Sequence, residues 1–131
     1  RVDDRDGSEE ARMSGIEFLS AVTLASSDME RSLAFYLGLG FELRPGRDSP
    51  EFCSLAAGES HLNLQLVPGY RAPSEVWGRV ILWVADVDAV HDRAVAAGFR
   101  PSTRPADAPW GERFFHVSDP DGHELSFATP L

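Results

Sequence analysis

Apolar and polar residues along this chain alternate with two different periods, and the periods predict the order of strands and helices. Residues 18–25 and 61–67 alternate with a period of two, which is typical of strands that bury one face. Between them, residues 29–37 repeat apolar side chains at helical spacing behind Ser27 or Asp28, either of which suits a helix N-cap. The polar face of the segment 61–67 consists of His61, Asn63 and Gln65.

The chain after the first helix has a less regular pattern. A short strand is expected to end at Leu43, because Pro45, Gly46 and Pro50 favour a turn beyond it. A further strand is expected near residues 52–57, before the tight turn that leads into the segment with the polar face. These elements complete a unit in which one strand and one helix precede three more strands.

The same order of elements occurs a second time, at a shift of 58 residues that places Asp86 on Asp28 (86 − 28 = 58). A second helix is expected over about residues 87–97, followed by a loop rich in Pro and Ala. The sequence Asp-Pro-Asp-Gly then predicts the turn of a hairpin whose arms are residues 113–118 and 123–128.

Each βαβββ unit is too small to bury the face of its own sheet, so we expect the two units to pair. The predicted fold is α+β: two βαβββ repeats form a curved mixed sheet around a concave cup, with the helices on the outside. Residues 16–131 form this single domain, with units at about 16–67 and 79–131 joined by the linker 68–78. Residues 1–15 are polar and lack a period, and they are predicted to be a flexible lead-in.

Charge and composition narrow the range of partners. Twelve Lys and Arg residues against 21 Asp and Glu residues give the 131-residue chain a formal net charge of −9. We therefore expect neither a nucleic acid nor an anionic membrane as partner, because phosphates require clustered cations; a small anionic ligand held by one or two arginines is compatible. No stretch approaches the roughly 20 apolar residues that cross a bilayer. The single Cys53 forms no internal disulfide, and we expect a reducing, cytoplasmic location.

Several strings, taken with the internal repeat, resemble a known superfamily. The vicinal oxygen chelate superfamily has strings similar to SSDMERSLAFYLGLGFEL, VADVDAVHDRAVAAGF and the closing DPDGHELSF. It includes glyoxalase I, extradiol dioxygenases, fosfomycin-modifying enzymes and bleomycin- or mitomycin-binding resistance proteins. The resemblance covers about residues 16–131 and implies the fold predicted above, which hosts many functions.

The metal-using branches of this superfamily hold one divalent cation with four His, Gln or Glu side chains. The resemblance places those four positions at Ala21, Arg79, Ser126, and Asn63 or Gln65. A guanidinium has no lone pair to donate and repels a cation, and a methyl group binds none. We therefore expect no metal and no cofactor, and neither glyoxalase I nor extradiol dioxygenase activity.

Aromatic side chains, rather than metal ligands, are expected to line the cup. Alternation along the strand that begins at Arg79 places Arg79, Ile81 and Trp83 on the concave side. Trp110 lies in a loop before the hairpin, where the sequence is similar to that of mitomycin-type binding proteins; in that group a tryptophan in this loop stacks on a flat drug. We assign no catalytic residue. The predicted ligand-binding residues are Arg79, Trp83, Trp110, His61, Asn63, Gln65 and Ser126.

These observations favour a binding protein over an enzyme. The first hypothesis is a homodimer that sequesters a planar or aromatic small molecule, such as an antibiotic, without a metal, with Arg79 on an acidic or carbonyl group of the ligand. The alternative is a lyase, isomerase or dioxygenase of the same superfamily with unusual metal ligands or none, using His61 or Glu124 as acid or base. A third hypothesis is a partner domain whose cup is an interface.

Overall fold

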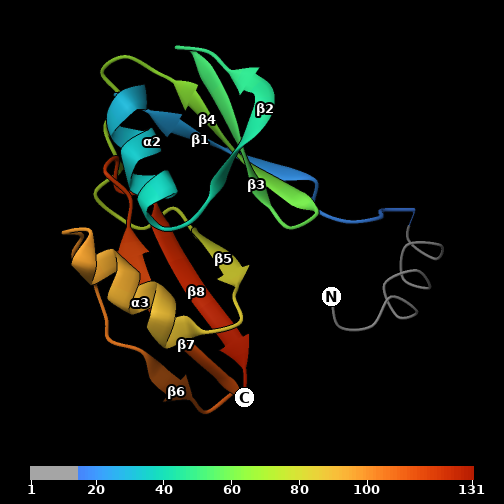
Figure 1. The fold of residues 1–131 in the computed structure, drawn as a ribbon, viewed down its shortest axis with the longest axis vertical. Helices are drawn as coiled ribbons and strands as arrows, with labels where there is room; N and C mark the ends of the chain where they lie inside the picture. The colour runs from blue at the N-terminus through green and yellow to red at the C-terminus, as the bar shows by residue number, and fades with distance from the viewer. Residues whose placement is uncertain (1–14) are drawn as a thin grey trace.

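The computed structural model describes residues 15–131, and the lead-in predicted for residues 1–15 lies almost wholly outside this range. The chain folds into two βαβββ units, as predicted, with both helices on the same side of the sheets (Figure 1). The first unit contains β1 (Ala21–Ser26), α2 (Met29–Gly38), β2 (Glu42–Asp48), β3 (Phe52–Ala57) and β4 (Ser60–Leu66). The second unit contains β5 (Arg79–Trp83), α3 (Val87–Ala96), β6 (Ala106–Ala108), β7 (Glu112–Ser118) and β8 (Glu124–Pro130).

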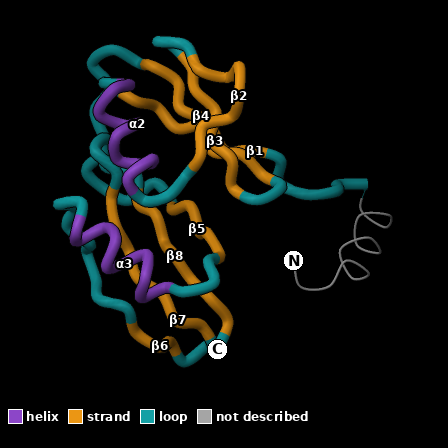
Figure 2. Tube along the Cα trace, in the orientation of Figure 1, coloured by secondary structure: helices purple, strands orange, loops and turns teal. Residues whose placement is uncertain are grey.

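Each unit forms its own four-stranded sheet, in the orders β1-β4-β3-β2 and β5-β8-β7-β6 (Figure 2). In each sheet the first strand pairs in parallel with the last strand of the unit, and the remaining pairs are antiparallel. Within residues 15–131 no strand ladder joins the two sheets, so the predicted mixed sheet consists of two sheets. Both β1 and β5 are therefore edge strands.

The two helices begin where the sequence predicts, because an aspartate caps each one. The Asp28 carboxylate accepts a hydrogen bond from the Arg31 backbone N–H at 3.1 Å. The Asp86 carboxylate accepts one from the Ala89 backbone N–H at 3.0 Å. Each cap satisfies a backbone donor that the helix itself leaves without a partner. Of the two residues predicted as the first cap, Asp28 therefore takes the role, and Ser27 does not.

The turn predicted around Pro45 and Gly46 is wrong, because β2 runs through both residues to Asp48. The pairing of β2 with β3 changes register between Leu43 and Asp48, and Gly46 has a φ of +70°. Proline lacks the N–H that an inner strand must donate, but β2 lies at the edge of its sheet, where that donor is not needed. The register shift accommodates the positive φ of Gly46, as a β-bulge does.

The second unit differs from its prediction only between the helix and the hairpin. A short strand, β6, lies within the predicted Pro- and Ala-rich loop and pairs with β7. The hairpin arms, β7 and β8, begin and end within two residues of the predicted bounds. The turn between them is closed by a hydrogen bond of 3.0 Å from the Gly122 N–H to the Asp119 carbonyl.

One hydrophobic core joins the two units. It contains residues from both sheets and both helices, including Leu24, Tyr36, Leu62, Phe115 and Phe127. The rings of Phe35 and Phe99 lie 4.7 Å apart across the helices, and those of Phe41 and Phe127 lie 6.4 Å apart across the units. Neither unit therefore buries its apolar face alone, which is the physical reason for the duplication.

Buried hydrogen bonds attach the hairpin turn of the second unit to the start of α2 in the first. The Tyr36 hydroxyl donates to Asp119 at 2.7 Å. The Asp121 carboxylate accepts a hydrogen bond from the Ser27 backbone N–H at 3.1 Å and one from the Ser32 hydroxyl at 3.2 Å. Burial raises the pKa of Asp119, whereas the hydrogen bond from Tyr36 lowers it. These contacts set the position of one unit against the other, and therefore the walls of any cavity between them.

His123, directly after the hairpin turn, also contacts the first unit and the linker. Its Nδ1 accepts a hydrogen bond from the Trp77 indole N–H at 3.2 Å, so Nε2 carries the proton and donates to the Ala25 carbonyl at 2.8 Å. The Tyr70 ring stacks on the imidazole at 5.4 Å. The linker between the units is thus held to the hairpin turn and to β1.

Candidate functional site

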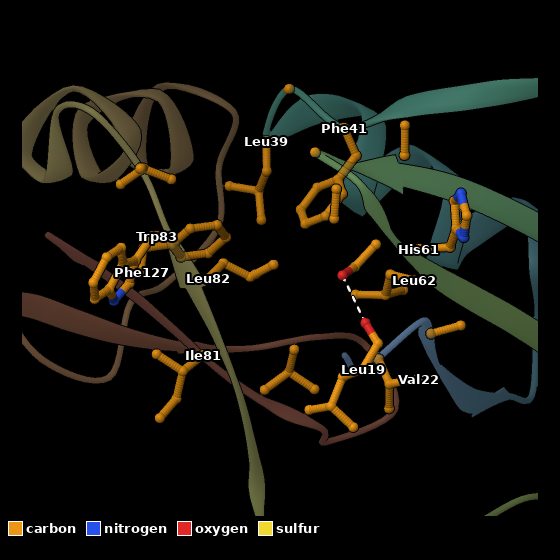
Figure 3. A pocket seen from close by; sticks show the side chains of 18 of the residues that line it. Leu19, Val22, Leu39, Phe41, His61, Leu62, Ile81, Leu82, Trp83 and Phe127 are labelled. Atoms are coloured by element: carbon orange, nitrogen blue, oxygen red, sulfur yellow. Dashed lines mark hydrogen bonds between the residues drawn. The ribbon is translucent and has the colours of Figure 1, made fainter. Parts of the chain in front are cut away.

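A cavity of about 790 Å³ lies between the two units, within the range of small-molecule sites, roughly 300–1,000 Å³. All five residues of β5 line it, because this edge strand has no neighbour on that side. Apolar side chains form most of both walls: Leu19, Val22 and Leu62 from the first unit, and Ile81, Leu82 and Trp83 from the second (Figure 3).

Among the described residues, three polar side chains line the cavity: Ser60, His61 and Arg79. The Ser60 hydroxyl donates a hydrogen bond of 2.8 Å to the Leu19 carbonyl, drawn as the dashed line in Figure 3. The Arg79 guanidinium donates from Nε to the Glu124 carboxylate at 2.8 Å, and its Nη2 lies 2.8 Å from the same oxygen. Glu124 does not line the cavity, so the ion pair orients Arg79 without placing a carboxylate in the cavity wall.

The concave face of the second sheet is aromatic at one end. Strand pairing places Trp83 on β5 beside Ala128 on β8, and Ala128 beside Phe114 on β7. Paired residues share a face of the sheet, so Trp83 and Phe114 lie on either side of the small Ala128. Trp110 extends this row, because its ring stacks on Phe114 at 5.7 Å with an angle of 27°. The Glu112 carboxylate accepts a hydrogen bond of 2.9 Å from the Trp110 indole N–H, which orients the ring.

The other end of the same face is polar. Ser126 pairs with Ile81 on one side and with His116 on the other. The His116 Nδ1 atom is buried and has no hydrogen-bond partner within the described part of the chain. Burial lowers the pKa of His116; the Glu124 carboxylate raises it and the Arg79 guanidinium lowers it. An imidazole that is neutral at neutral pH therefore lies beside a hydroxyl on this face of the sheet.

The structure brings three of the predicted ligand-binding residues together and leaves four apart from them. Arg79, Trp83 and His61 line the cavity, whereas Trp110, Ser126, Asn63 and Gln65 do not. Trp110 and Ser126 lie on the concave face of the second sheet. Asn63 donates to the Thr23 hydroxyl at 3.3 Å on the first sheet, and Gln65 is exposed on the same strand, β4.

Sequence reasoning missed Phe114, His116 and Glu112 as members of the concave face. The signal was present, because Phe115 and Val117 are buried and alternate with these three residues along β7. A period of two along the hairpin, like that along the strand at Arg79, predicts that the three residues share one face.

Comparison with known proteins establishes the family. Residues 18–127 match the Glyoxalase/Bleomycin resistance protein/Dioxygenase superfamily, and the chain belongs to it. Uncharacterised proteins of Mycobacterium bovis and Mycobacterium tuberculosis are each 33% identical to it over 95 residues, 70% of this chain. The chain spans about half the length of these curated relatives, 54% and 48% respectively.

Solved structures of the superfamily share the fold. TioX from Micromonospora sp. ML1 is 29% identical and superimposes with a TM-score of 0.69, covering 87% of this chain and 99% of TioX. A family enzyme from Burkholderia phytofirmans is 22% identical with a TM-score of 0.74, covering 86% of this chain and 98% of the enzyme. The fold predicted from the repeat is therefore confirmed. The narrower resemblance to the antibiotic-binding branch stays a prediction.

The resemblance places the superfamily's metal-ligand positions at Ala21, Arg79, Ser126, and Asn63 or Gln65, and strand pairing bears on the last of these. Ser126 pairs with Ile81, two residues beyond Arg79, and the matching pair in the first unit is Asn63 with Thr23. By this pairing Asn63 is the counterpart of Ser126 in the first unit, and the expected set is Ala21, Asn63, Arg79 and Ser126. A methyl group, an amide, a guanidinium and a hydroxyl do not fit a divalent cation, which prefers imidazole or carboxylate ligands. Residues 15–131 also contain no cluster of three or more His, Cys, Asp or Glu side chains placed to hold a metal ion.

Three expectations about the setting of the protein have different outcomes. No helix in the described range is long and apolar enough to cross a membrane. The predicted cytoplasmic location and the predicted homodimer are not tested by the structure of one chain, and both stay predictions.

Proposed function

We propose that this protein binds a planar or aromatic small molecule in its cup, without a bound metal ion, as the antibiotic-binding branch of the superfamily does. The observation that carries this proposal is the row formed by Trp83, Phe114 and Trp110. Trp83 and Trp110 are 57% and 68% exposed. Large apolar rings that face solvent together commonly mark a binding surface.

The row is suited to stacking. The Trp110 ring is already oriented by Phe114 and by its hydrogen bond to Glu112, so little side-chain entropy is lost when a ligand binds. Stacking on such a ring contributes about 0.5–1.5 kcal/mol beyond the burial of apolar area. Arg79 and Ser126 supply polar contacts at the other end, which would fix the direction of the ligand.

Binding of this kind needs no chemistry. A protein that sequesters its ligand lowers the free concentration of that ligand by mass action, and tight binding suffices. The cup accordingly combines ring contacts with few polar anchors. Of the two acid or base candidates of the alternative, an enzyme of the same superfamily, Glu124 is engaged by Arg79, and only His61 lines the cavity.

Tryptophan fluorescence tests the proposal. Titration of the protein with bleomycin, mitomycin and phenazine-type compounds is expected to give a saturable change with at least one of them. Trp110→Ala is expected to weaken that binding about 10- to 100-fold, the equivalent of roughly 1.5–3 kcal/mol for a lost stacking ring and its buried area. The free energy of unfolding is expected to change by about 1 kcal/mol or less, since Trp110 lies at the surface.

Trp77→Phe is the matched control, because it removes an indole that lies outside the cup and bonds to His123. Ligand affinity is expected to survive this change. A flat response to the whole panel, or equal weakening by both variants, would contradict the proposal.

A further inference from the structure

The lining of the cavity has a charge pattern opposite to that of the chain as a whole. The chain has 21 Asp and Glu residues and a net charge of −9. Among the described residues, none of these carboxylates lines the cavity, and its only titratable side chains are Arg79 and His61. The walls are otherwise almost wholly apolar. A charged group that enters such a site must find an opposite charge or a hydrogen-bond donor there.

We propose that the ligand is an aromatic molecule with one acidic group, a carboxylate, which Arg79 binds at the cavity wall. This inference rests on the proposed function and names the chemical class of its ligand. The aromatic body lies against Trp83 and Ile81, and the carboxylate meets the guanidinium at the start of the same strand, β5.

The geometry of Arg79 leaves a donor edge for this carboxylate. Nε and Nη2 are both engaged by Glu124 at 2.8 Å, whereas Nη1 has no hydrogen-bond partner among the described residues. The ion pair fixes the plane of the guanidinium, so the free edge is oriented before a ligand arrives. Hydrogen bonds between a guanidinium and a carboxylate are stronger than those between neutral groups.

His61 provides a second donor from the first unit. Its ring nitrogens make no hydrogen bond within the described range, and its strand partner on β1 is Ala21, which also lines the cavity. Figure 3 shows His61 at the opposite side of the cavity from Trp83 and Ile81. An imidazole N–H donates one hydrogen bond, so His61 offers an anionic ligand a second contact, and Arg79 supplies the charge.

Three naphthalene probes that carry an anionic, a neutral and a cationic group at the same ring position test the inference. They are 2-naphthoate, 2-naphthamide and 2-naphthylmethylammonium, and their affinities are measured by isothermal titration calorimetry at neutral pH and low salt. The carboxylate is expected to bind about 10- to 100-fold more tightly than the amide, as a charge-assisted hydrogen bond predicts. The ammonium is expected to bind most weakly.

Substitution of Arg79 tests whether this residue causes the preference for the carboxylate probe. Arg79→Gln is expected to abolish the preference for naphthoate, but it also leaves Glu124 unpaired and repulsive. The double variant Arg79→Gln with Glu124→Gln removes both charges, and the preference is still expected to be lost. Arg100→Gln is the matched control, since Arg100 is exposed and does not line the cavity. If the Arg79 variants fold poorly, His61→Gln is the second test, and it is expected to reduce the preference for naphthoate over naphthamide.

The outcomes separate this inference from the proposed function. Equal affinity for the three probes overturns the inference that the ligand has an acidic group, but it does not contradict the proposal that the protein binds an aromatic molecule. Retention of the preference in the double variant overturns the role of Arg79. Failure of all three probes to bind overturns the inference, and the proposed function fails with it only if the antibiotic panel also gives no response.

Discussion

Replacement of Tyr36 by Phe tests whether the hydrogen bonds between the units set their arrangement. Tyr36 is fully buried, and its ring packs on Phe35 and Phe41 at 5.1 and 5.4 Å. The change keeps the ring and removes only the hydroxyl, which donates to Asp119 Oδ2 at 2.7 Å. Asp119 Oδ1 keeps its bonds from the Asp121 and His123 backbone N–H groups, both 2.9 Å long. The variant therefore isolates one contact between the units.

The expected cost follows from the charge on the acceptor. A hydrogen bond to a charged group contributes about 1.5–3 kcal/mol, and the change leaves one carboxylate oxygen buried without this partner. We expect the free energy of unfolding to fall by about 2 kcal/mol at neutral pH. For a domain of this size, the melting temperature should fall by roughly 5–10 °C.

The pH dependence of this cost has a definite sign. The hydrogen bond from Tyr36 lowers the pKa of Asp119, and burial raises it. Tyr36→Phe therefore raises that pKa further, and as the pH falls the variant binds a proton on Asp119 before the parent protein does. The cost is full above both pKa values and shrinks as the pH falls through the higher one, because a protonated acid no longer requires a donor there.

Urea unfolding measures both effects. The parent protein, Tyr36→Phe, Asp119→Asn and the double variant form a cycle, measured at pH values of about 7.5 and 5.5. Most of the cost of Tyr36→Phe is expected to disappear in the Asp119→Asn background. A cost below about 0.5 kcal/mol at neutral pH, or one that is unchanged by Asp119→Asn, would refute the reasoning.

Two further predictions concern the cup. The pKa of His116 is lowered from its ordinary value of 6.5 by burial, so the unfolded chain binds a proton there first, and stability should fall as the pH drops through that value. His116→Gln should reduce the loss of unfolding free energy between pH values of about 7.5 and 5.5; an equal loss in both proteins would contradict this. Elemental analysis of the purified protein should find far less than one divalent ion per chain, since the resemblance places Arg79 at a ligand position; one tightly held ion per chain would favour the enzymatic alternative.

Much of the candidate site follows from local alternation. On β5, the exposed residues Arg79, Ile81 and Trp83 alternate with the less exposed Val80 and Leu82, as the period of two predicts. The same alternation along β7 places Phe114 and His116 on one face of that strand. These residues share a face because successive side chains on any strand point to opposite sides.

Alternation along single strands does not predict the cavity. Its two walls come from strands that are not hydrogen-bonded to each other, and no periodicity reports the space between them. The partner of Arg79 was equally hidden, because Glu124 is 45 residues away and becomes its neighbour only through the parallel pairing of β5 with β8. Pairing likewise makes Asn63, rather than Gln65, the counterpart of Ser126 in the first unit.

The sequence by itself determined the two units, the aspartate caps of both helices and the faces of the strands, since these depend on residues a few positions apart. Only the tertiary structure decided that β2 continues through Pro45 at a sheet edge and that Asp121 reaches Ser27 across 94 residues. It also decided which side chains meet at the cavity. Local periods depend on the geometry of one strand or helix, whereas contacts between distant segments depend on how the whole chain buries its apolar surface and pairs its buried polar groups.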